Sequence, residues 1–505
     1  MHGIEYILEA ISLYHISIAL AGVVAGTVIG ALPGLTATMA IAVLVPFTFS
    51  MKPASALILM GAIYTGAIYG GAYSAILLNT PGTPSAIATT FDGYPMAKRG
   101  DGDLAVTLAC TSSVLGGLIG AMFLLLLAPP LAKIALAFGP VEYFWLAIFG
   151  LSLISALSEG HMLKGLIGGC FGMLLTTIGV GEVSADIRYT FGNQTLIGGI
   201  EPVSALIGLY CIPVLIDLVA TQARHLKVGT EGRGFRLREA LSLSWRYKFN
   251  LVRSSVIGTI TGILPGAGGS IAGLVAYSEA RRSSKRTEYF GTGEPEGVMA
   301  SESANNATVG GGFIPTLVLG IPGTPPDAVI LGALLVQGIR TGPKLFVGGE
   351  SSIVYIFIAG LFIATLLMLP TGLLIGRYAY RFIISVPKAV LVPTVAFMTI
   401  IGTYAIRNNM SDVVIMIVLG AIGWVLDRYG FKPSPIVLGL ILSRIAEQGF
   451  VQGWIIGTAR GNAAAEFFNR PISVGIIAFI GVSMFYPLIA RRWRLKEEPK
   501  NDLKT

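Results

Sequence analysis

Charged residues are scarce in this sequence. Only 12% of its 505 residues are Asp, Glu, Lys or Arg, whereas 53% are hydrophobic, and an ordinary soluble domain carries roughly 25% charged residues. A water-soluble surface cannot be built from this composition. Apolar runs of about 20 residues recur along the chain, each long enough to cross a hydrocarbon layer about 30 Å thick as a helix. The sequence predicts an all-α polytopic membrane protein with about 12 membrane segments.

Histidine and cysteine are also rare. The four histidines lie near predicted helix ends or in loops: His2, His15, His161 and His225. An intramembrane hydrolase needs a nucleophile with a base, or an acid pair, so an enzyme is not supported. The three cysteines are far apart, without metal-ligand spacing, and are expected to be packing residues: Cys110, Cys170 and Cys211. We expect no catalytic residues and no cofactor, with sodium as a coupling ion.

Three further signals are missing. No G-x-x-x-x-G-K-[ST] loop is present to hold ATP, which argues against a primary pump. The N-terminus has no basic region and no small-residue cleavage site, so a cleaved signal peptide is not expected. The formal net charge is +8, but the basic residues cluster between apolar spans. Positive-inside topology explains that clustering better than nucleic-acid binding.

Glycine and proline are abundant, and they sit inside apolar segments. The chain has 65 glycines and 26 prolines. Broken backbone cannot face lipid, so these breaks must be buried in protein or line a cavity. This pattern indicates a binding site built from interrupted helices.

The two halves of the chain echo each other. The segment Gly26–Gly34 matches Gly258–Gly266 at an offset of 232 residues, and Pro81–Pro84 matches Pro322–Pro325 at an offset of 241. A third echo, at an offset of 231, relates Pro202 to Pro433. We therefore divide the chain into a first repeat (1–222), a basic cytoplasmic linker (223–248), a second repeat (249–455), and an extra C-terminal transmembrane helix with a cytoplasmic tail (456–505).

Basic residues indicate that the repeats are inverted. Before residue 53 only Lys52 is basic, whereas the second Leu-Pro-Gly segment is bracketed by basic residues: Arg246, Lys248, Arg253, Arg281, Arg282, Lys285 and Arg286. Under the positive-inside rule the first copy starts outside and the second inside. Inverted repeats are common in secondary transporters. Each Leu-Pro-Gly element is expected to be a hairpin that turns at Pro-Gly, and the basic tail around Arg492 places the C-terminus in the cytoplasm.

The strongest local motif is Asn79-Thr80-Pro81-Gly82-Thr83-Pro84. Its prolines must break the helix, and Thr83-Pro84 can restart it. A half-helix N-terminus at the bilayer midplane suits a carboxylate. The alternative is a proline kink in a packed helix, but two equivalent breaks favour a site. The predicted substrate-binding residues are Asn79, Thr80, Gly82, Thr83, Asn305, Asn306, Gly323 and Thr324.

The Pro-Gly turns are expected to meet these breaks and to bind the coupling cation. Glycine lets carbonyl oxygens approach an ion, and hydroxyls complete its shell. The predicted cation-binding residues are Gly34, Thr36, Gly266, Gly268 and Ser270. The alternative is a tight turn in which glycine supplies a positive φ.

Other polar residues near the breaks have simpler interpretations. Asp92 is expected near the cytoplasmic interface as a helix cap or a partner of Lys98. Glu302 is either functional or faces water at the interface. Three tyrosines at helical spacing are expected to pack in small-residue grooves: Tyr64, Tyr69 and Tyr73.

Several of these motifs carry a resemblance to a known family. Leu32-Pro33-Gly34, the run from Asn79 to Gly100, and Ala304-Asn305-Asn306 leading to Gly320-Ile321-Pro322-Gly323 resemble the large membrane subunit of the tripartite tricarboxylate transporters, the TctA family, over essentially the whole chain. The resemblance implies a bacterial cytoplasmic-membrane permease for carboxylates such as citrate. It implies cation-driven uptake, a small four-helix membrane subunit (TctB-like) and a periplasmic solute-binding protein (TctC-like) as partners. Thr324-Pro325-Pro326-Asp327 departs from the pattern and leaves the role of Asp327 open.

Two interpretations of the function are compatible with the sequence. A secondary transporter that works by alternating access fits the broken helices and the resemblance. A channel or scaffold is the alternative, and it would show no gradient-driven accumulation.

Overall fold

The computed structural model describes residues 2–157, 162–181, 183–220, 236–266, 268–347, 350–379, 386–482 and 484. Within these residues the chain is almost entirely helical, apart from one short antiparallel pair, β1 (Gly179–Val180) and β2 (Ile187–Arg188). The chain divides into two compact units, one formed by Met1–Leu136 with Glu201–Val425 and the other by Ala137–Ile200 with Leu426–Thr505. Each unit contains residues from both sequence repeats.

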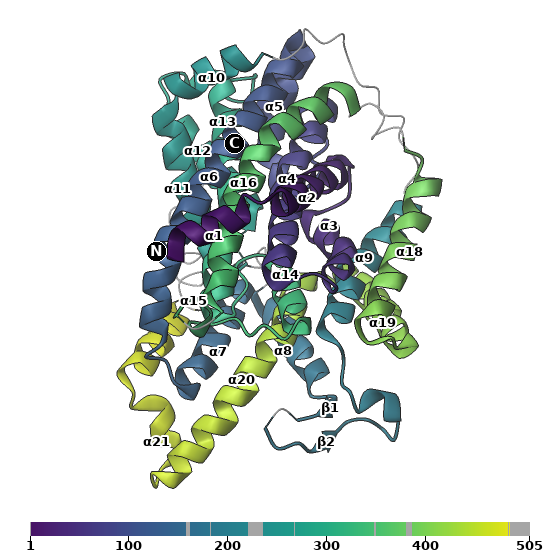
Figure 1. The fold of residues 1–505 in the computed structure, drawn as a ribbon, viewed down its shortest axis with the longest axis vertical. Coiled ribbons are helices and arrows are strands. Elements are labelled where there is room, and N and C mark those ends of the chain that lie inside the picture. The colour runs from purple at the N-terminus through teal and green to yellow at the C-terminus, as the bar shows by residue number, and fades with distance from the viewer. Residues whose placement is uncertain are drawn as a thin grey trace, which may run out of the picture. The chain divides into compact units, whose positions relative to one another are not determined.

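The first unit holds most of the helices (Figure 1). Up to its excursion into the second unit it contains α1 (His2–Ala10), α2 (Leu13–Ala31), α3 (Ala37–Leu44), η1 (Val45–Thr48), α4 (Pro53–Leu78), η2 (Pro84–Ala86), α5 (Ile87–Met96), η3 (Ala97–Asp101) and α6 (Gly102–Ala135). It resumes with α9 (Pro202–Ala220), α10 (Leu237–Arg246), α11 (Lys248–Ile263), α12 (Gly268–Ser283), η5 (Thr287–Tyr289), α13 (Pro295–Leu319), α14 (Pro325–Val336), α15 (Lys344–Val347), α16 (Ser351–Leu374), η6 (Ile375–Ala379), α18 (Lys388–Arg407) and α19 (Met410–Arg428).

The second unit is smaller. It contains α7 (Pro140–Leu157), α8 (Met162–Thr176), η4 (Gln194–Leu196), α20 (Pro433–Ala459) and α21 (Ala463–Phe468). Here α20 packs against both α7 and α8. Glu142, which is fully buried, pairs with Arg470 at 2.7 Å and accepts the N–H of Gly139 at 2.8 Å. A buried carboxylate in this unit therefore has a basic partner.

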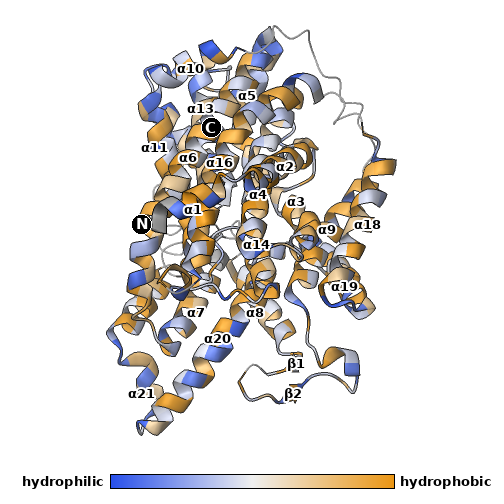
Figure 2. Ribbon diagram, viewed as in Figure 1, coloured by the Kyte–Doolittle hydropathy of each residue, from blue (hydrophilic) through white to orange (hydrophobic). Residues whose placement is uncertain are grey.

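Eight helices in the described residues are long and apolar enough to cross a membrane. Five shorter apolar helices accompany them, among them Pro471–Val482 near the C-terminus. Figure 2 shows apolar residues along most helices and polar residues along α10. These findings confirm a polytopic helical membrane protein. The expected total of about 12 segments and the inverted layout stay predictions, because length and composition do not give direction.

Two long helices, α4 and α13, form the buried centre of the first unit. Every residue of α13 from Glu296 to Val318 is buried, and so is α4 apart from its ends and Leu59. Polar residues make α13 too hydrophilic to count among the apolar spans, although it is the most enclosed helix. It packs against α6, α11 and α12, while α4 packs against α2 and α16.

Close contacts between helices recur in the two halves of the chain, at the same residue offsets as the repeated sequence motifs. A Cβ added to Gly30 on α2 would overlap the carbonyl of Ala67 on α4, and one added to Gly262 on α11 would overlap the carbonyl of Thr308 on α13. Gly262 follows Gly30 by 232 residues and Thr308 follows Ala67 by 241. The same close helix contact thus occurs once in each half.

The predicted domain boundaries are not tested by this arrangement. Part of the predicted linker, residues 223–235, lies outside the described residues, and its remainder forms α10 and the start of α11. Arg236, just before α10, pairs with Asp101 at 2.5 Å. The basic tail around Arg492 also lies outside the described residues.

Candidate functional site

Two helices break where the sequence predicts. The first, α4, ends at Leu78, Asn79 takes a left-handed conformation with φ of 52°, and the chain restarts as η2 and α5 after Thr83. The second, α13, ends at Leu319, Gly320 is left-handed with φ of 71°, and α14 starts after Thr324. Both are full interruptions of the helix and not kinks within it.

The backbone conformation at position 79 explains why an asparagine occurs there. Left-handed conformation is unfavourable for most L-residues, and Asn tolerates it best after Gly. The equivalent residue in the second repeat is Gly320, which needs no such tolerance. The side chain of Asn79 is exposed and that of Thr80 half-buried. These two predicted substrate residues therefore lie at the rim of the first break.

Each Pro-Gly turn lies against the break of its own repeat. The N–H of Gly266 donates to the carbonyl of Gly323 at 2.9 Å, which confirms the expected meeting of turn and break in the second repeat. In the first repeat, a Cβ on Gly82 would overlap the carbonyl of Gly30, one turn before the Pro-Gly turn. Turn and break are thus packed backbone to backbone.

Most of the predicted cation-binding residues have structural roles in these turns or at the start of the helix that follows. Gly34 and Gly266 have φ of 91° and 85°, so the tight-turn interpretation holds for both. Thr36 caps α3 by accepting the N–H of Met39 at 3.1 Å. Gly268 and Ser270 lie half-buried in the first turn of α12. Ala267, between Gly266 and Gly268, lies outside the described residues, and ion binding at these turns stays a prediction.

The second break is capped by the protein itself, although Asp327 Oδ1 has no hydrogen-bond partner among the described residues. Asp327 is fully buried, and its Oδ2 accepts the N–H of Thr324 at 2.9 Å and the hydroxyl of Thr324 at 2.5 Å. This is a capping box at the start of α14. Tyr64 lies 2.7 Å from the hydroxyl of Thr324, and because Thr324 uses its only proton on Asp327, Tyr64 must be the donor. Sequence reasoning had Tyr64 as a packing residue and missed this bond.

The first break lacks such a network. Asp327 has its equivalent in Ala86, which carries no carboxylate. Thr83 and Ser85, both buried, lie 2.9 Å apart through their hydroxyls. The amide of Asn305 is completely buried, and among the described residues neither its nitrogen nor its oxygen has a hydrogen-bond partner.

Asn305 lies beside the first break. A Cβ built on Gly269, in the first turn of α12, would overlap both the Asn305 Oδ1 and the Cβ of Ser85. The amide therefore lies where the start of α12 meets the restart after the first break. Buried amides are normally paired, so an unpaired one next to two hydroxyls and a helix start is a candidate ligand-binding group. Ser85 was missed by sequence reasoning, although it follows the restart proline Pro84.

The neighbouring Asn306 has a different role. Its Oδ1 accepts the hydroxyl of Thr65 at 2.6 Å, which joins α13 to α4. The structure thus brings Gly82, Thr83 and Asn305 together at the first break. Gly323 and Thr324 lie at the second break, where the capping box uses the polar groups.

A second polar cluster surrounds Glu302, two turns into α13. Glu302 is fully buried, so it does not face water. The hydroxyl of Thr89 on α5 donates to Oε1, and the hydroxyl of Ser113 on α6 donates to Oε2 at 2.9 Å. Thr89 also lies 3.1 Å from the hydroxyl of Ser301. The sequence carried no signal for Thr89 and Ser113, which lie on two other helices.

Asp92 corrects one expectation. It is fully buried, and its Oδ1 accepts the backbone N–H groups of Gly291, Gly293 and Glu294 at 2.7 to 2.8 Å. Its Oδ2 accepts the hydroxyl of Tyr277 at 2.9 Å. The expectation of a helix cap or a partner for Lys98 is wrong, because the side chain turns inward and holds the loop that precedes α13.

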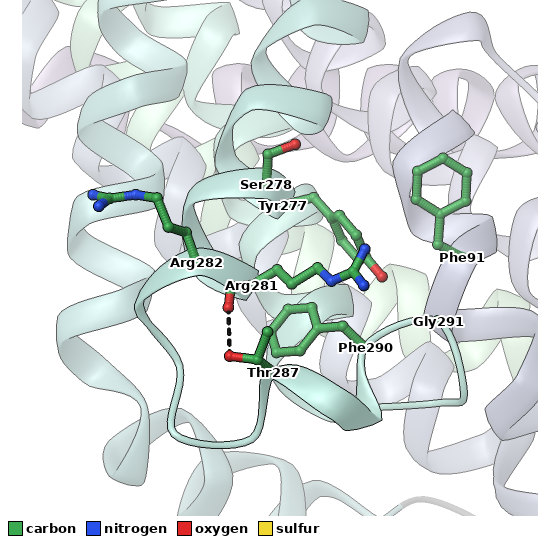
Figure 3. Close-up of a pocket in the computed structure, with 8 residues that line it drawn as sticks. All are labelled: Phe91, Tyr277, Ser278, Arg281, Arg282, Thr287, Phe290 and Gly291. Carbon is green, nitrogen blue, oxygen red and sulfur yellow. Dashed lines mark hydrogen bonds between the residues drawn. The ribbon is translucent and has the colours of Figure 1, made fainter. Parts of the chain in front are cut away.

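A pocket of about 640 Å³ opens over this loop (Figure 3). It is lined by Phe91, Tyr277, Ser278, Arg281, Arg282, Thr287, Phe290 and Gly291. In Figure 3 Arg281 reaches towards Tyr277, whereas Arg282 points away. The pocket combines aromatic walls with one inward guanidinium and is separate from the first break.

The chain is a polytopic helical membrane protein in which two interrupted helices pack against Pro-Gly turns. The family model described as "Tripartite tricarboxylate transporter TctA family" matches residues 16–438. The chain belongs to the tripartite tricarboxylate transporter TctA family. It is therefore a component of a tripartite transport system, and its family is one of transporters.

Two relatives come from Agrobacterium vitis. "Uncharacterized 52.8 kDa protein in TAR-I ttuC' 3'region" is 37% identical over 458 residues, covering 90% of each chain. "Uncharacterized protein in TAR-II ttuC' 3'region" is 38% identical over 221 residues, covering 44% of this chain and 89% of that protein. No solved structure matches this chain.

Proposed function

We propose that this chain is the permease subunit that carries di- or tricarboxylates, such as citrate-like anions, across the bacterial cytoplasmic membrane. Its partners in this proposal are a small four-helix membrane subunit and a periplasmic solute-binding protein that delivers the carboxylate. The substrate carboxylate binds at the first break, between Thr83, Ser85 and Asn305. Alternating access of this site to the two sides then moves the substrate.

One comparison within the molecule supports the position of the carboxylate. At the second break, the start of α14 already has a carboxylate, because Asp327 accepts the N–H and hydroxyl of Thr324. At the first break, the equivalent residue is Ala86, and the amide of Asn305 is unpaired. A substrate carboxylate would supply the missing acceptor for amide and hydroxyl donors, at a helix start that favours negative charge.

Net charge makes coupling to cations a requirement of this proposal. One elementary charge moved against 100 mV costs about 2.3 kcal/mol, so a trianion entering a negative interior meets about 7 kcal/mol before any concentration gradient. At least three monovalent cations must enter with it to cancel its charge. We propose sodium as the coupling ion, with the Pro-Gly turns at Gly34 and Gly266 and the hydroxyls of Thr36 and Ser270 as its binding groups.

The decisive experiment places a carboxylate at the first break. Ala86→Asp should give this break its own acceptor and abolish uptake of labelled carboxylates into proteoliposomes that hold the chain with its partner subunits. Ala86→Asn is the matched control of equal size, since both variants overpack the same buried position at about 1 to 3 kcal/mol. Equal loss of uptake in both variants would contradict a charge-based block.

A second arm distinguishes the transporter from the channel or scaffold. Uptake by the wild-type system should rise with an inward sodium gradient and fall when that gradient collapses. A channel or scaffold would accumulate no substrate against its gradient. Full uptake in sodium-free buffer, without a proton gradient, would contradict cation coupling.

A further inference from the structure

We propose that Glu302 and the hydroxyls of Thr89, Ser113 and Ser301 form a binding site for one monovalent cation, distinct from the Pro-Gly turns. The proposal deepens the proposed function, because it gives the coupling ion a site next to the first break. The cation is sodium or a proton, and both share the chemistry of neutralising one carboxylate among oxygen ligands.

The first observation is that Glu302 has different bonding partners from the other fully buried carboxylates. Glu142 pairs with Arg470, Asp92 accepts three backbone N–H groups, and Asp327 caps a helix start, as described above. In the part of the chain that the structure describes, Glu302 bonds only to hydroxyls. Neutral hydroxyls do not balance a full negative charge inside a membrane protein.

The position of Glu302 on its helix removes another source of compensation. It is the eighth residue of α13, which starts at Pro295. The favourable effect of a helix N-terminus on a negative charge is confined to the first turn. Asp327, by contrast, lies in the first turn of α14. The helix therefore does not compensate the negative charge of Glu302, and a bound cation would neutralise it.

Charged groups on the surrounding helices are engaged elsewhere. Asp92 accepts the hydroxyl of Tyr277, and Arg253 lies 3.6 Å from Glu279. Cys110 on α6 is a titratable group whose charge would act on Glu302, and an ionised thiol would repel it. Among the described residues, the packed elements supply no positive charge to the carboxylate.

The second observation is the oxygen set. Two carboxylate oxygens and three hydroxyls from α5, α6 and α13 form a chain of hydrogen bonds, in which Ser113 bonds to Oε2, Thr89 bonds to Oε1, and Ser301 lies 3.1 Å from Thr89. Ser301 can donate its proton to the carbonyl of Val298, at 3.1 Å, which leaves its oxygen lone pairs directed elsewhere. Carboxylate and hydroxyl oxygens suit a hard monovalent cation, and a single carboxylate matches a single positive charge.

The third observation links this site to the substrate site. Thr89 lies on α5, the helix that follows the first break, four residues after Ser85. Glu302 precedes Asn305 by three residues on α13, so the two side chains lie one turn apart on neighbouring faces. A cation at Glu302 would tie α5 to α13 at the first break. Occupancy of the two sites is therefore coupled through the same two helices.

The test measures ion binding by the purified full-length chain, without substrate or partner subunits. Thermal unfolding is followed in sodium chloride and in choline chloride of equal ionic strength, and over a range of pH. The wild-type midpoint should rise with sodium, or with acid if the ion is a proton. Glu302→Gln, which is permanently neutral, should lose the part of that response that comes from this site, so that only a contribution from the Pro-Gly turns remains. Glu288→Gln, an exposed residue of η5, is the matched control and should respond as the wild type does.

Two hydroxyl variants separate sodium from a proton. Thr89→Val and Ser113→Ala keep the carboxylate, so they also serve if Glu302→Gln does not fold. For sodium, each should raise several-fold the concentration that gives half of the shift. For a proton, sodium should have no effect and the acid response should persist in both variants. A Glu302→Gln chain with the full wild-type response, or a wild-type chain that responds to neither ion, would overturn the proposal.

This result is independent of uptake. A Glu302-dependent ion response in a chain that fails to transport carboxylates would support the cation site and count against the permease assignment. Sodium-driven uptake together with an unchanged ion response in Glu302→Gln would support the permease assignment and count against the cation site at Glu302.

Discussion

Tyr64 donates its hydroxyl proton to Thr324, 2.7 Å away and on the other sequence repeat. Asn305 follows Tyr64 by the same 241 residues that separate the two breaks. Each side chain thus projects from its own long helix towards the break of the opposite repeat. Tyr64 finds a partner there, whereas the amide of Asn305 finds none among the described residues.

Tyr64→Phe should therefore affect stability and not transport. The variant loses one buried hydrogen bond, which contributes about 0.5 to 1.5 kcal/mol to the free energy of unfolding. Thr324 keeps its bond to Asp327, so the second break stays capped. We expect a lower unfolding midpoint for the purified chain and uptake within about twofold of the wild type. Abolished uptake with unchanged stability would place Tyr64 in the transport site instead.

The adjacent asparagines of α13 should separate binding from folding. Asn305→Leu removes an unpaired buried amide, so stability should be unchanged or improved, while carboxylate uptake should be lost. Asn306→Leu leaves the hydroxyl of Thr65 without its main partner and should destabilise the fold by about 1 to 3 kcal/mol. Uptake per folded molecule and the unfolding midpoint measure the two effects. The same phenotype in both variants would show that position 305 is a packing residue.

Asn79 provides a test of the break itself. Asn79→Gly should leave stability nearly unchanged, because glycine adopts the left-handed conformation freely and stands at the equivalent position 320. Asn79→Ala should cost about 1 to 2 kcal/mol, since alanine disfavours that conformation. If Asn79→Gly keeps the fold and loses uptake, the amide contacts substrate. If it keeps both, only the backbone of Asn79 matters.

The inverted layout can be tested by labelling. A cysteine at Lys52 should react with an impermeant thiol reagent from the periplasmic side of intact cells, whereas one at Arg282 should react only after the membrane is opened. The native Cys110, Cys170 and Cys211 are replaced first, so that only the introduced thiol reports. Labelling of both sites from one side would rule out inversion.

The interruptions of the helices were predictable because their causes are local. Proline removes a donor and restricts its predecessor, and this fixed the ends at Asn79 and Gly320 before any packing was known. Repeated Pro-Gly spacing then related the two halves. The positive φ of Gly34 and Gly266 follows from the same turn chemistry.

The polar partners were not predictable, because they are set by tertiary packing. Glu302 bonds to Thr89 and Ser113, which are 213 and 189 residues away. Nothing in the local sequence of Glu302 distinguishes such a site from a water-facing interface. Asp92 was misjudged for the same reason: nearby Lys98 suggested a partner, but the backbone of a loop about 200 residues away provides it.

Asp327 has a consequence for stoichiometry. Gene duplication would ordinarily give a chain two equivalent ligand sites. Here one copy carries its own carboxylate at Asp327, whereas the other has Ala86 at that place. Calorimetric titration should therefore yield one carboxylate bound per chain and not two. The second copy thus holds a built-in carboxylate at the place where the first copy is proposed to bind a substrate carboxylate.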